Sequence, residues 1–239
     1  MNNKSVAISQ SNYIPWKGYF DMINSVDEFI IYDDMQFTKR DWRNRNTIKT
    51  PNGLQWLTIP VKVKGKFFQK INETEIDGSS WAEKHWRTIQ MNYSKAPAFK
   101  MYESKIQQLY EQAAQKKLLS DVNFMFISEA CSMLGINTKI RWSSEFNLLD
   151  GKTERLLDLC KQVGATRYIS GPSARDYIVE SLFFKESIDL RWMNYRDYPE
   201  YPQKFGGFQH SVSILDLIFN LGTEAKTALK SFNGGVVYE

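Results

Sequence analysis

The chain has 239 residues, 42% of them hydrophobic, so it can bury a sizeable core. Its 31 Lys and Arg nearly balance 27 Asp and Glu, and the net charge of +4 excludes the strongly basic surface of a non-specific nucleic-acid-binding protein. Cys131 and Cys160 stand in apolar helical patterns, which indicates buried thiols and no disulfide framework. Without a signal sequence or a span of roughly 20 apolar residues, we expect a cytoplasmic protein with no membrane span.

The first 37 residues alternate strand, loop, short helix and strand. A short apolar run at residues 6–8 predicts a buried strand, and the apolar run at 29–32 predicts a second one. Between them, apolar residues recur at helical spacing over 19–26. This alternation is typical of an open α/β sheet, in which ligands bind at the carboxyl ends of the strands.

The central part predicts a hairpin and a layer of helices. Residues 54–63, after a Pro-Asn-Gly turn, resemble one strand of a hairpin, with 71–76 as its partner. Helices are expected from Ser79, as N-cap, to about 93, then over 100–117 and 121–134. These helices should form a layer of their own.

The C-terminal part returns to alternating strands and helices. Strands are predicted at 139–142, 167–170 and 188–192, and helices after Thr153, after Gly171 and from Ser213 to Gly222. We therefore predict a single α/β domain over residues 1–239. It should have a Rossmann-like, largely parallel sheet, a β-hairpin insertion near residues 50–76 and a helical layer.

A cationic, amide-rich segment follows the second predicted strand, and we expect it to form an exposed or cleft-facing loop. Guanidinium groups pair bidentately with phosphate oxygens, so this segment could clamp a diphosphate. The alternative is a solvated basic loop balanced by nearby aspartates, although the intervening Trp42 favours the clamp. The residues in question are Lys39, Arg40, Arg43, Asn44, Arg45 and Asn46.

A second anion site is suggested after the strand at 167–170. Ser170, Gly171 and Ser173 would place backbone amides and a hydroxyl at a helix N-terminus, with Arg175 close by. An ordinary capped helix explains the same residues. The glycines are too few for a phosphate-binding loop or a dinucleotide fingerprint.

Three residues are candidates for a general base: His85, His210 and Asp34. Histidine has the pKa best suited to proton transfer near neutrality, although a lone histidine in a helix is more often structural. Asp33 and Asp34, at a strand end, could hold Mg²⁺ or pair with the nearby arginines. No cluster of Cys and His has the spacing of a zinc site.

Several long motifs resemble the WbqC-like family. They are QSNYIPWKGYF at residues 10–20, DDMQF at 33–37, RDWRNRN at 40–46, WLTIPV at 56–61, YISG at 168–171 and SILDL at 213–217. Proteins of this family typically belong to gene clusters for O-antigen, a part of lipopolysaccharide, and for other bacterial surface polysaccharides. The resemblance implies a transferase that adds an acyl or aminoacyl group, glycyl being one option, to a nucleotide-linked deoxyamino sugar.

The residues are compatible with that chemistry. Arginines 40, 43 and 45 could hold the diphosphate, while Tyr13, Trp16 and Trp42 offer aromatic surface for base and sugar. Acyl transfer needs a base for the amine proton and donors for the developing oxyanion. Gln10, Asn12 and the amide at Gly171 could be those donors.

Two other functions remain open. The opening topology also resembles that of nucleotidyltransferases and pantothenate-synthetase-type ligases, which would form an acyl adenylate from ATP. Those enzymes use a His-x-Gly-His pair, and this chain has Trp16-Lys17-Gly18-Tyr19 instead. A non-catalytic nucleotide-sugar-binding protein is the third possibility. The cofactor is left open between ATP and an acyl thioester of CoA or a carrier protein, as are the sugar, the acyl donor and the oligomeric state.

Overall fold

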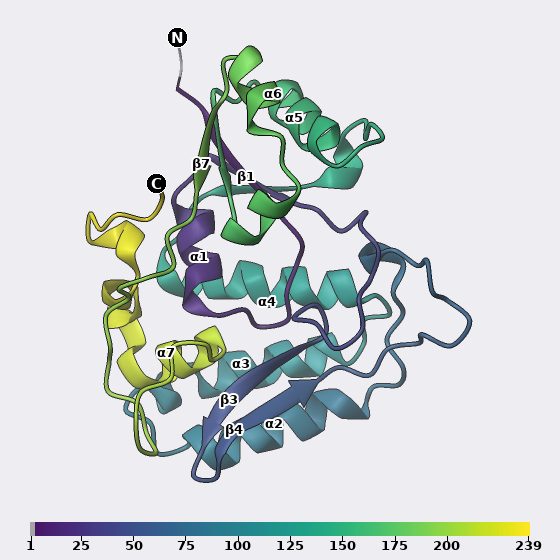
Figure 1. Cartoon of the computed structure of the whole chain (residues 1–239). Helices are drawn as coiled ribbons and strands as arrows, with labels where there is room; N and C mark the ends of the chain where they lie inside the picture. The colour runs from purple at the N-terminus through teal and green to yellow at the C-terminus, as the bar shows by residue number, and fades with distance from the viewer. Residues whose placement is uncertain (1–2) are drawn as a thin grey trace.

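The computed structural model describes residues 3–239, and in this range five strands form one parallel sheet in the order β5-β2-β1-β6-β7 (Figure 1). Ile8 lies opposite Ile30 of β2, and Ala7 lies opposite Ile169 of β6. The sheet confirms the predicted Rossmann-like α/β class. Its strands are β1 (Ser5–Ser9), β2 (Glu28–Ile31), β5 (Lys139–Trp142), β6 (Arg167–Ser170) and β7 (Asp189–Trp192).

Alternate residues of the strands point to opposite faces of the sheet, and helices cover both faces. Ala7 and Phe29 pack into one hydrophobic cluster with α1 (Lys17–Asn24), α4 (Leu119–Leu134) and α7 (Ile214–Leu221). Val6 and Ile30 pack on the other face with α5 (Thr153–Gln162) and α6 (Glu180–Lys185). β1 and β2 are therefore buried on both sides, which explains their nearly continuous apolar runs.

A third hydrophobic cluster holds the predicted helical layer together. It joins α2 (Ser80–Tyr93), α3 (Phe99–Ala113) and the first half of α4 to a β-hairpin made of β3 (Arg45–Thr50) and β4 (Gly53–Thr58). In Figure 1 this hairpin lies over α2, below the parallel sheet.

The hairpin is present and turns at residues 51–53 as predicted, but its predicted partner strand was wrong. β4 pairs with β3, while Ile76 forms an isolated bridge with Val61. The segment around Asn46 had been expected to form a loop because it is so polar. In the structure the amide of Asn46 donates hydrogen bonds to the carbonyl oxygens of Tyr13 and Ile14, while Ile48 is buried.

The predicted helix starts were partly right. Ser213 caps α7, since its Oγ accepts a hydrogen bond from the backbone N–H of Leu215 at 3.3 Å. Among the described residues the Ser79 side chain makes no capping bond to α2. Thr153 is the first residue of α5, and its hydroxyl donates to the carbonyl oxygen of Tyr177 instead. The helix expected after Gly171 is a five-residue 3₁₀ turn, Pro172–Asp176.

Both cysteines are free and buried, as predicted. Burial raises the pKa of the Cys131 thiol to about 12 and also raises that of Cys160. Over residues 3–239 no helix is both long enough and apolar enough to cross a bilayer.

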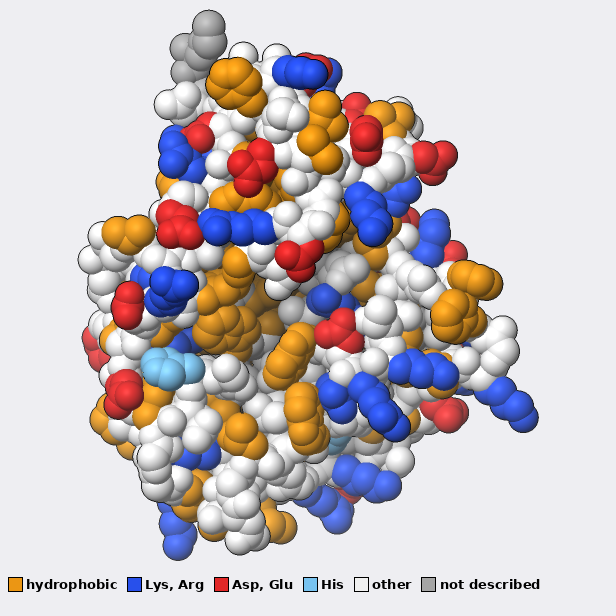
Figure 2. Space-filling view, viewed as in Figure 1, with side chains coloured by type: hydrophobic (Ala, Val, Ile, Leu, Met, Phe, Trp, Pro, Cys, Tyr) orange, Lys and Arg blue, Asp and Glu red, His pale blue; other side chains and the backbone are white. Residues whose placement is uncertain are grey.

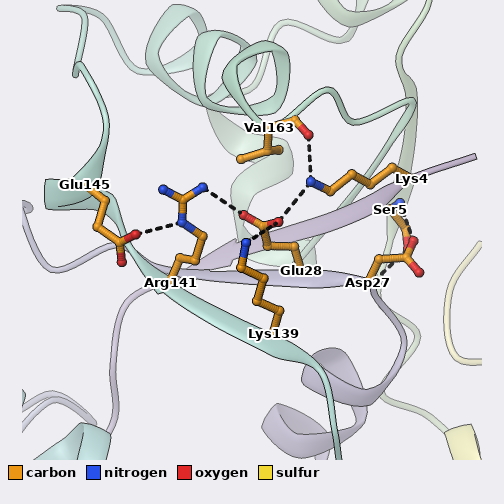
Figure 3. Close-up of polar contacts among 8 residues, drawn as sticks. All are labelled: Lys4, Ser5, Asp27, Glu28, Lys139, Arg141, Glu145 and Val163. Atoms are coloured by element: carbon orange, nitrogen blue, oxygen red, sulfur yellow. Dashed lines mark hydrogen bonds and ion pairs between the residues drawn. The ribbon is translucent and has the colours of Figure 1, made fainter. Parts of the chain in front are cut away.

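A charged cluster closes the amino-terminal edge of the sheet (Figure 3). The carboxylate of Glu28, whose side chain is only 3% exposed, lies 2.9 Å from Lys4, 3.4 Å from Arg141 and 3.9 Å from Lys139. Arg141 also pairs with Glu145 at 2.7 Å. The cluster links the starts of β2 and β5 to the residue before β1, at the edge away from the strands' carboxyl ends.

Candidate functional site

The strand order places a topological switch point at the carboxyl ends of β1 and β6. The chain leaves β1 toward β2 on one side and later returns to β6 on the other, so the direction of winding reverses between these two strands. Nucleotides and other ligands bind at this switch point in open α/β sheets. The loop after β1, residues 10–16, and the turn after β6 both start there.

A buried polar network fixes the loop after β1. The Asp33 carboxylate accepts hydrogen bonds from the backbone N–H of Ser11 at 2.8 Å, from the Ser11 hydroxyl at 2.6 Å and from the Ser120 hydroxyl at 2.5 Å. The amide of Asn123 donates to Ser11 Oγ and to the carbonyl oxygen of Arg43, both at 2.9 Å. Burial raises the pKa of Asp33 despite these donors. Asp33 therefore holds two loops together.

Arg43 connects the cationic segment to the same loop. Its guanidinium donates to the side-chain oxygen of Asn12 and, at 3.4 Å, to the carbonyl oxygen of Ser11. It also lies 3.8 Å from the Asp41 carboxylate. Within residues 3–239 the buried Nε of Arg43 has no hydrogen-bond partner. A buried donor without a partner is unusual.

The backbone is strained at Ile14, in the same loop. Its φ is +37°, in a region that a β-branched residue rarely adopts. The Asn46 amide holds this conformation by donating to the carbonyl oxygen of Ile14 at 2.9 Å. Strain of this kind tends to concentrate at functional sites, where the surrounding structure enforces it.

A pocket of about 180 Å³ opens beside this loop. The ring of Trp16 packs against Tyr195 and Tyr198, with centroid distances of 5.1 and 5.6 Å. Trp42 is 43% exposed and lies 5.5 Å from Trp56. Figure 2 shows a hollow in this face, with hydrophobic side chains inside it. The pocket is lined by Asn12, Pro15, Trp16, Trp42, Asn46 and Ser211.

The structure places the three candidate bases in different surroundings. His85 is buried: its Nδ1 lies 2.9 Å from the Tyr13 hydroxyl, and burial lowers its pKa to about 4. Asp34, with a side chain 12% exposed, accepts hydrogen bonds from Ser143 at 2.6 Å and Asn72 at 3.2 Å. His210 is exposed and directly precedes Ser211, which lines the pocket.

The His210 ring packs edge-on against Phe208 at 4.6 Å. Partial burial and the nearby charge of Lys17 lower its pKa below the usual value, which favours the neutral ring. Of the three candidates, only His210 combines solvent access with a place next to the pocket.

Within residues 3–239, neither Asp33 nor Asp34 forms an ion pair with an arginine. In the described part of the chain Asp33 is bonded to serines, and the ion-pair partner of Asp34 is Lys70 at 3.7 Å. No group of three or more His, Cys, Asp and Glu side chains within residues 3–239 is arranged to hold a metal ion.

The other predicted residues of the N-terminal half do not line the pocket. The Gln10 carbonyl oxygen accepts from the Tyr19 hydroxyl, Tyr13 is fully buried, and the Asn44 amide donates to the Ile59 carbonyl oxygen. The Arg45 guanidinium stacks 4.1 Å over the Trp56 ring and donates to the carbonyl oxygen of Arg40, an exposed residue.

The residues predicted for the second anion site lie after β6. Ser170 is buried, and its Oγ accepts from the Tyr168 hydroxyl at 3.2 Å. Gly171 lies beside Met22 of α1. Ser173 is exposed, while Arg175 pairs with Glu239 at 2.8 Å and covers the Trp192 ring. None of the four lines the pocket beside Trp42.

Sequence reasoning missed Lys17, which organises the wall behind Trp16. Its ammonium group donates to the carbonyl oxygen of Pro199 at 2.9 Å and lies about 5 Å from the rings of Tyr198, Tyr201 and Phe208. Burial lowers its pKa to about 8. The Tyr/Pro/Gly composition of residues 194–207 was the available signal, because cations favour aromatic faces. Nothing in the sequence singled out Ser211.

The sequence is similar to a known relative and to a protein family. An uncharacterized protein of Mycobacterium tuberculosis, Rv1507c, is 55% identical over 227 residues, which cover 95% of this chain and 98% of the relative. No solved structure matches the chain. The WbqC-like protein family matches residues 10–228, which include every motif named above. The chain belongs to the WbqC-like protein family.

Proposed function

We propose that the protein is a transferase of surface-polysaccharide biosynthesis. It adds an acyl or aminoacyl group, a glycyl group among them, to the amino group of a nucleotide-linked deoxyamino sugar. The observation that carries the proposal is the pocket of about 180 Å³ next to the switch point of the sheet, with Asn12, Asn46, Trp16 and Trp42 in its wall. Amides and indole rings are the groups that recognise the hydroxyls and the apolar face of a sugar.

The nucleotide part of the substrate would extend from this pocket along the crevice. The cationic segment, with Lys39, Arg40, Arg43 and Arg45, would lie beside the diphosphate. Charged hydrogen bonds from guanidinium to phosphate are among the stronger polar contacts in proteins. The pocket by itself is about the size of one sugar ring, so the diphosphate and base must lie outside it.

The chemistry requires a base and an oxyanion site. The sugar amine attacks the acyl carbonyl carbon, a C–N bond forms, and the tetrahedral oxyanion then expels the thiolate or adenylate leaving group. His210 is the base we propose for the amine proton. Asn12 already uses its side-chain oxygen to accept from Arg43, so its NH₂ group is the part that would donate to the oxyanion.

The proposal is tested by direct assay. Purified protein is incubated with dTDP-linked amino sugars and a panel of acyl-CoA thioesters, and the acylated sugar nucleotide is detected by mass. His210→Ala should lower turnover by about 10²–10⁴-fold with nucleotide-sugar affinity unchanged. Full turnover in that variant would rule out His210 as the base.

Trp42→Ala tests the pocket itself. Losing the indole face should weaken nucleotide-sugar binding by roughly tenfold or more, as is typical for removing a stacking aromatic ring. Isothermal titration measures the affinity. Phe184→Ala is the matched control, because Phe184 is also exposed but belongs to α6 and lies outside the pocket lining. Equal affinities for both variants would place sugar binding elsewhere.

Acyl adenylate formation is the second candidate, favoured by the strand order, which nucleotide-binding sheets share. Exchange of pyrophosphate into ATP in the presence of an amino acid would support it. Acylation from a thioester without ATP would support the first candidate. If neither reaction occurs while nucleotide-sugars still bind, a non-catalytic binding protein is the remaining function.

A further inference from the structure

Two large aromatic side chains stand exposed at the tip of the loop between β4 and the 3₁₀ turn Ile71–Glu73. Phe67 is 72% exposed and Phe68 is 83% exposed, and their rings pack edge-on at 4.9 Å. Figure 1 shows this loop projecting from the side of the molecule, and Figure 2 shows hydrophobic side chains standing out at that edge. A soluble domain gains nothing by presenting two adjacent phenylalanines to water.

The loop is also strongly basic. Residues 61–70 read VKVKGKFFQK, with four lysines and no acidic residue. Lys62 and Lys66 share one carboxylate, that of Glu75, at 2.8 and 2.7 Å. Within the described residues Lys64 has no ion-pair partner, and Lys70 lies 3.7 Å from Asp34. Lys39 and Arg40, on the neighbouring loop, are exposed as well. Among the described residues, the four lysines of the loop therefore have only two carboxylates as ion-pair partners, so positive charge exceeds negative charge around the phenylalanines.

Side-chain hydrogen bonds hold the loop at two points. The side-chain amide of Gln36 donates to the carbonyl oxygen of Phe67 at 2.8 Å, and that of Gln69 donates to the carbonyl oxygen of Lys62 at 3.0 Å. The loop turns at Gly65, whose φ of +74° favours glycine. Because the loop is already ordered, binding another molecule or surface through its tip costs little conformational entropy.

We propose that the Phe67–Phe68 tip docks the protein reversibly on the surface of an anionic phospholipid bilayer. The two rings would enter the boundary between headgroups and acyl chains, and the lysines would lie among the anionic headgroups. Lysine stems can cover apolar surface while their charges stay at the headgroup level. A projecting tip suits a soft bilayer better than a protein partner, which usually needs about 800 Å² of complementary surface on each side.

The docked orientation also bears on the site. Gln36, which bonds to Phe67, belongs to the chain segment that continues into Trp42 of the pocket wall. Docking would therefore hold the pocket near the bilayer surface without placing any residue across it.

The test uses the full chain and sedimentation with vesicles of phosphatidylcholine alone or with 30% phosphatidylglycerol. Binding is expected with the anionic vesicles, weakening as salt is added. Phe67→Ser with Phe68→Ser should reduce partitioning by at least about tenfold, since two exposed phenylalanines lose their apolar burial. Lys64→Glu should reduce it by at least about fivefold, the effect expected from one lysine near such a surface.

Matched controls separate this loop from general surface effects. Phe184→Ser with Met91→Ser removes two side chains that are 85% and 81% exposed elsewhere, and Lys84→Glu changes an exposed lysine of α2. These variants should bind vesicles like the parent. Absence of binding to anionic vesicles at low salt, or equal losses in test and control variants, overturns the proposal. An acidic protein partner would give the first of these results.

Discussion

Tyr13 and His85 show how a residue chosen for its chemistry can be required for packing. The His85 ring is bonded to the Tyr13 hydroxyl at 2.9 Å, and Tyr13 is bonded in turn to the Tyr110 hydroxyl at 2.8 Å. A backbone hydrogen bond to Thr58 raises the pKa of His85, but burial outweighs it and keeps the ring neutral. A buried, neutral histidine that is hydrogen-bonded to other residues of the protein is suited to a structural role.

This arrangement predicts a pH dependence of stability. The folded-state pKa of His85 is about 4, below the ordinary value of 6.5, so the unfolded chain binds the proton more readily between these values. The stabilisation is fully present above pH 6.5 and is lost as the pH falls toward 4. Between pH 7 and pH 5 the unfolding free energy should fall about 2 kcal/mol more in the parent than in His85→Gln.

Urea titrations at the two pH values measure that difference. The control is His210→Gln, because His210 is the exposed histidine and its contribution should be small. If parent and His85→Gln lost equal stability, the His85 ring would have to be protonated without cost in the folded protein.

Single residues of the candidate site could be predicted from the sequence where the residue type itself suggests ligand binding. Asn12, Trp16 and Trp42 combine polar or aromatic character with a place after a strand, and all three line the pocket. Ser211 and Lys17 were not predictable, because a serine in a loop and a lysine at a helix start are common. Their importance arises from contacts with residues far along the chain, such as Lys17 with Pro199.

Helices and strands could be predicted where the local pattern of apolar and polar residues agrees with the burial of those residues. β1 and β2 read as nearly continuous apolar runs because helices cover both faces of the sheet. The first strand of the hairpin could not be predicted because its sequence is polar. Asn46, Thr47 and Lys49 are buried because other elements supply their hydrogen-bond partners. The Tyr93 hydroxyl, for example, accepts a hydrogen bond from the backbone N–H of Lys49. Such partners are not visible from the strand itself.

The start of α1 gives a prediction at this scale. Replacing Gly18 by Ala should favour a helix by about 1 kcal/mol on propensity alone. However, the new methyl would lie 2.3 Å from the Trp16 ring, which cannot move freely because Tyr195 and Tyr198 pack against it. We expect a net loss of about 1–3 kcal/mol of stability and a distorted pocket wall.

Thermal unfolding measures the stability of Gly18→Ala, and ligand titration measures the pocket. Gly207→Ala is the control, since a methyl there meets nothing within 4 Å. A Gly18→Ala protein as stable as the parent would mean that Trp16 swings aside easily and is not a fixed part of the wall.

At the scale of the whole molecule, the candidate site and the Glu28 cluster lie at opposite ends of the strands of the sheet. The carboxyl edge carries the loops with Asn12, Arg43 and Trp42 and the strained Ile14. The amino edge carries Glu28 and its three cations (Figure 3). A mutation at the amino edge should therefore change stability without changing the site.

Glu28→Gln tests this separation. The substitution keeps the shape of the side chain but removes a buried charge that faces Lys4, Lys139 and Arg141. Breaking a buried ion pair costs about 3–5 kcal/mol of stability. Here the cations are partly solvated, and the side chain of Lys139 is 65% exposed. We therefore expect Glu28→Gln to lower the unfolding free energy by about 1–3 kcal/mol. Glu145→Gln breaks only the half-exposed pair with Arg141 and should cost under about 1 kcal/mol. Nucleotide-sugar affinity, measured well below the melting temperature, should equal that of the parent in both variants. A loss of affinity in Glu28→Gln alone would show that the amino ends of the strands are coupled to the pocket through β1 and β2.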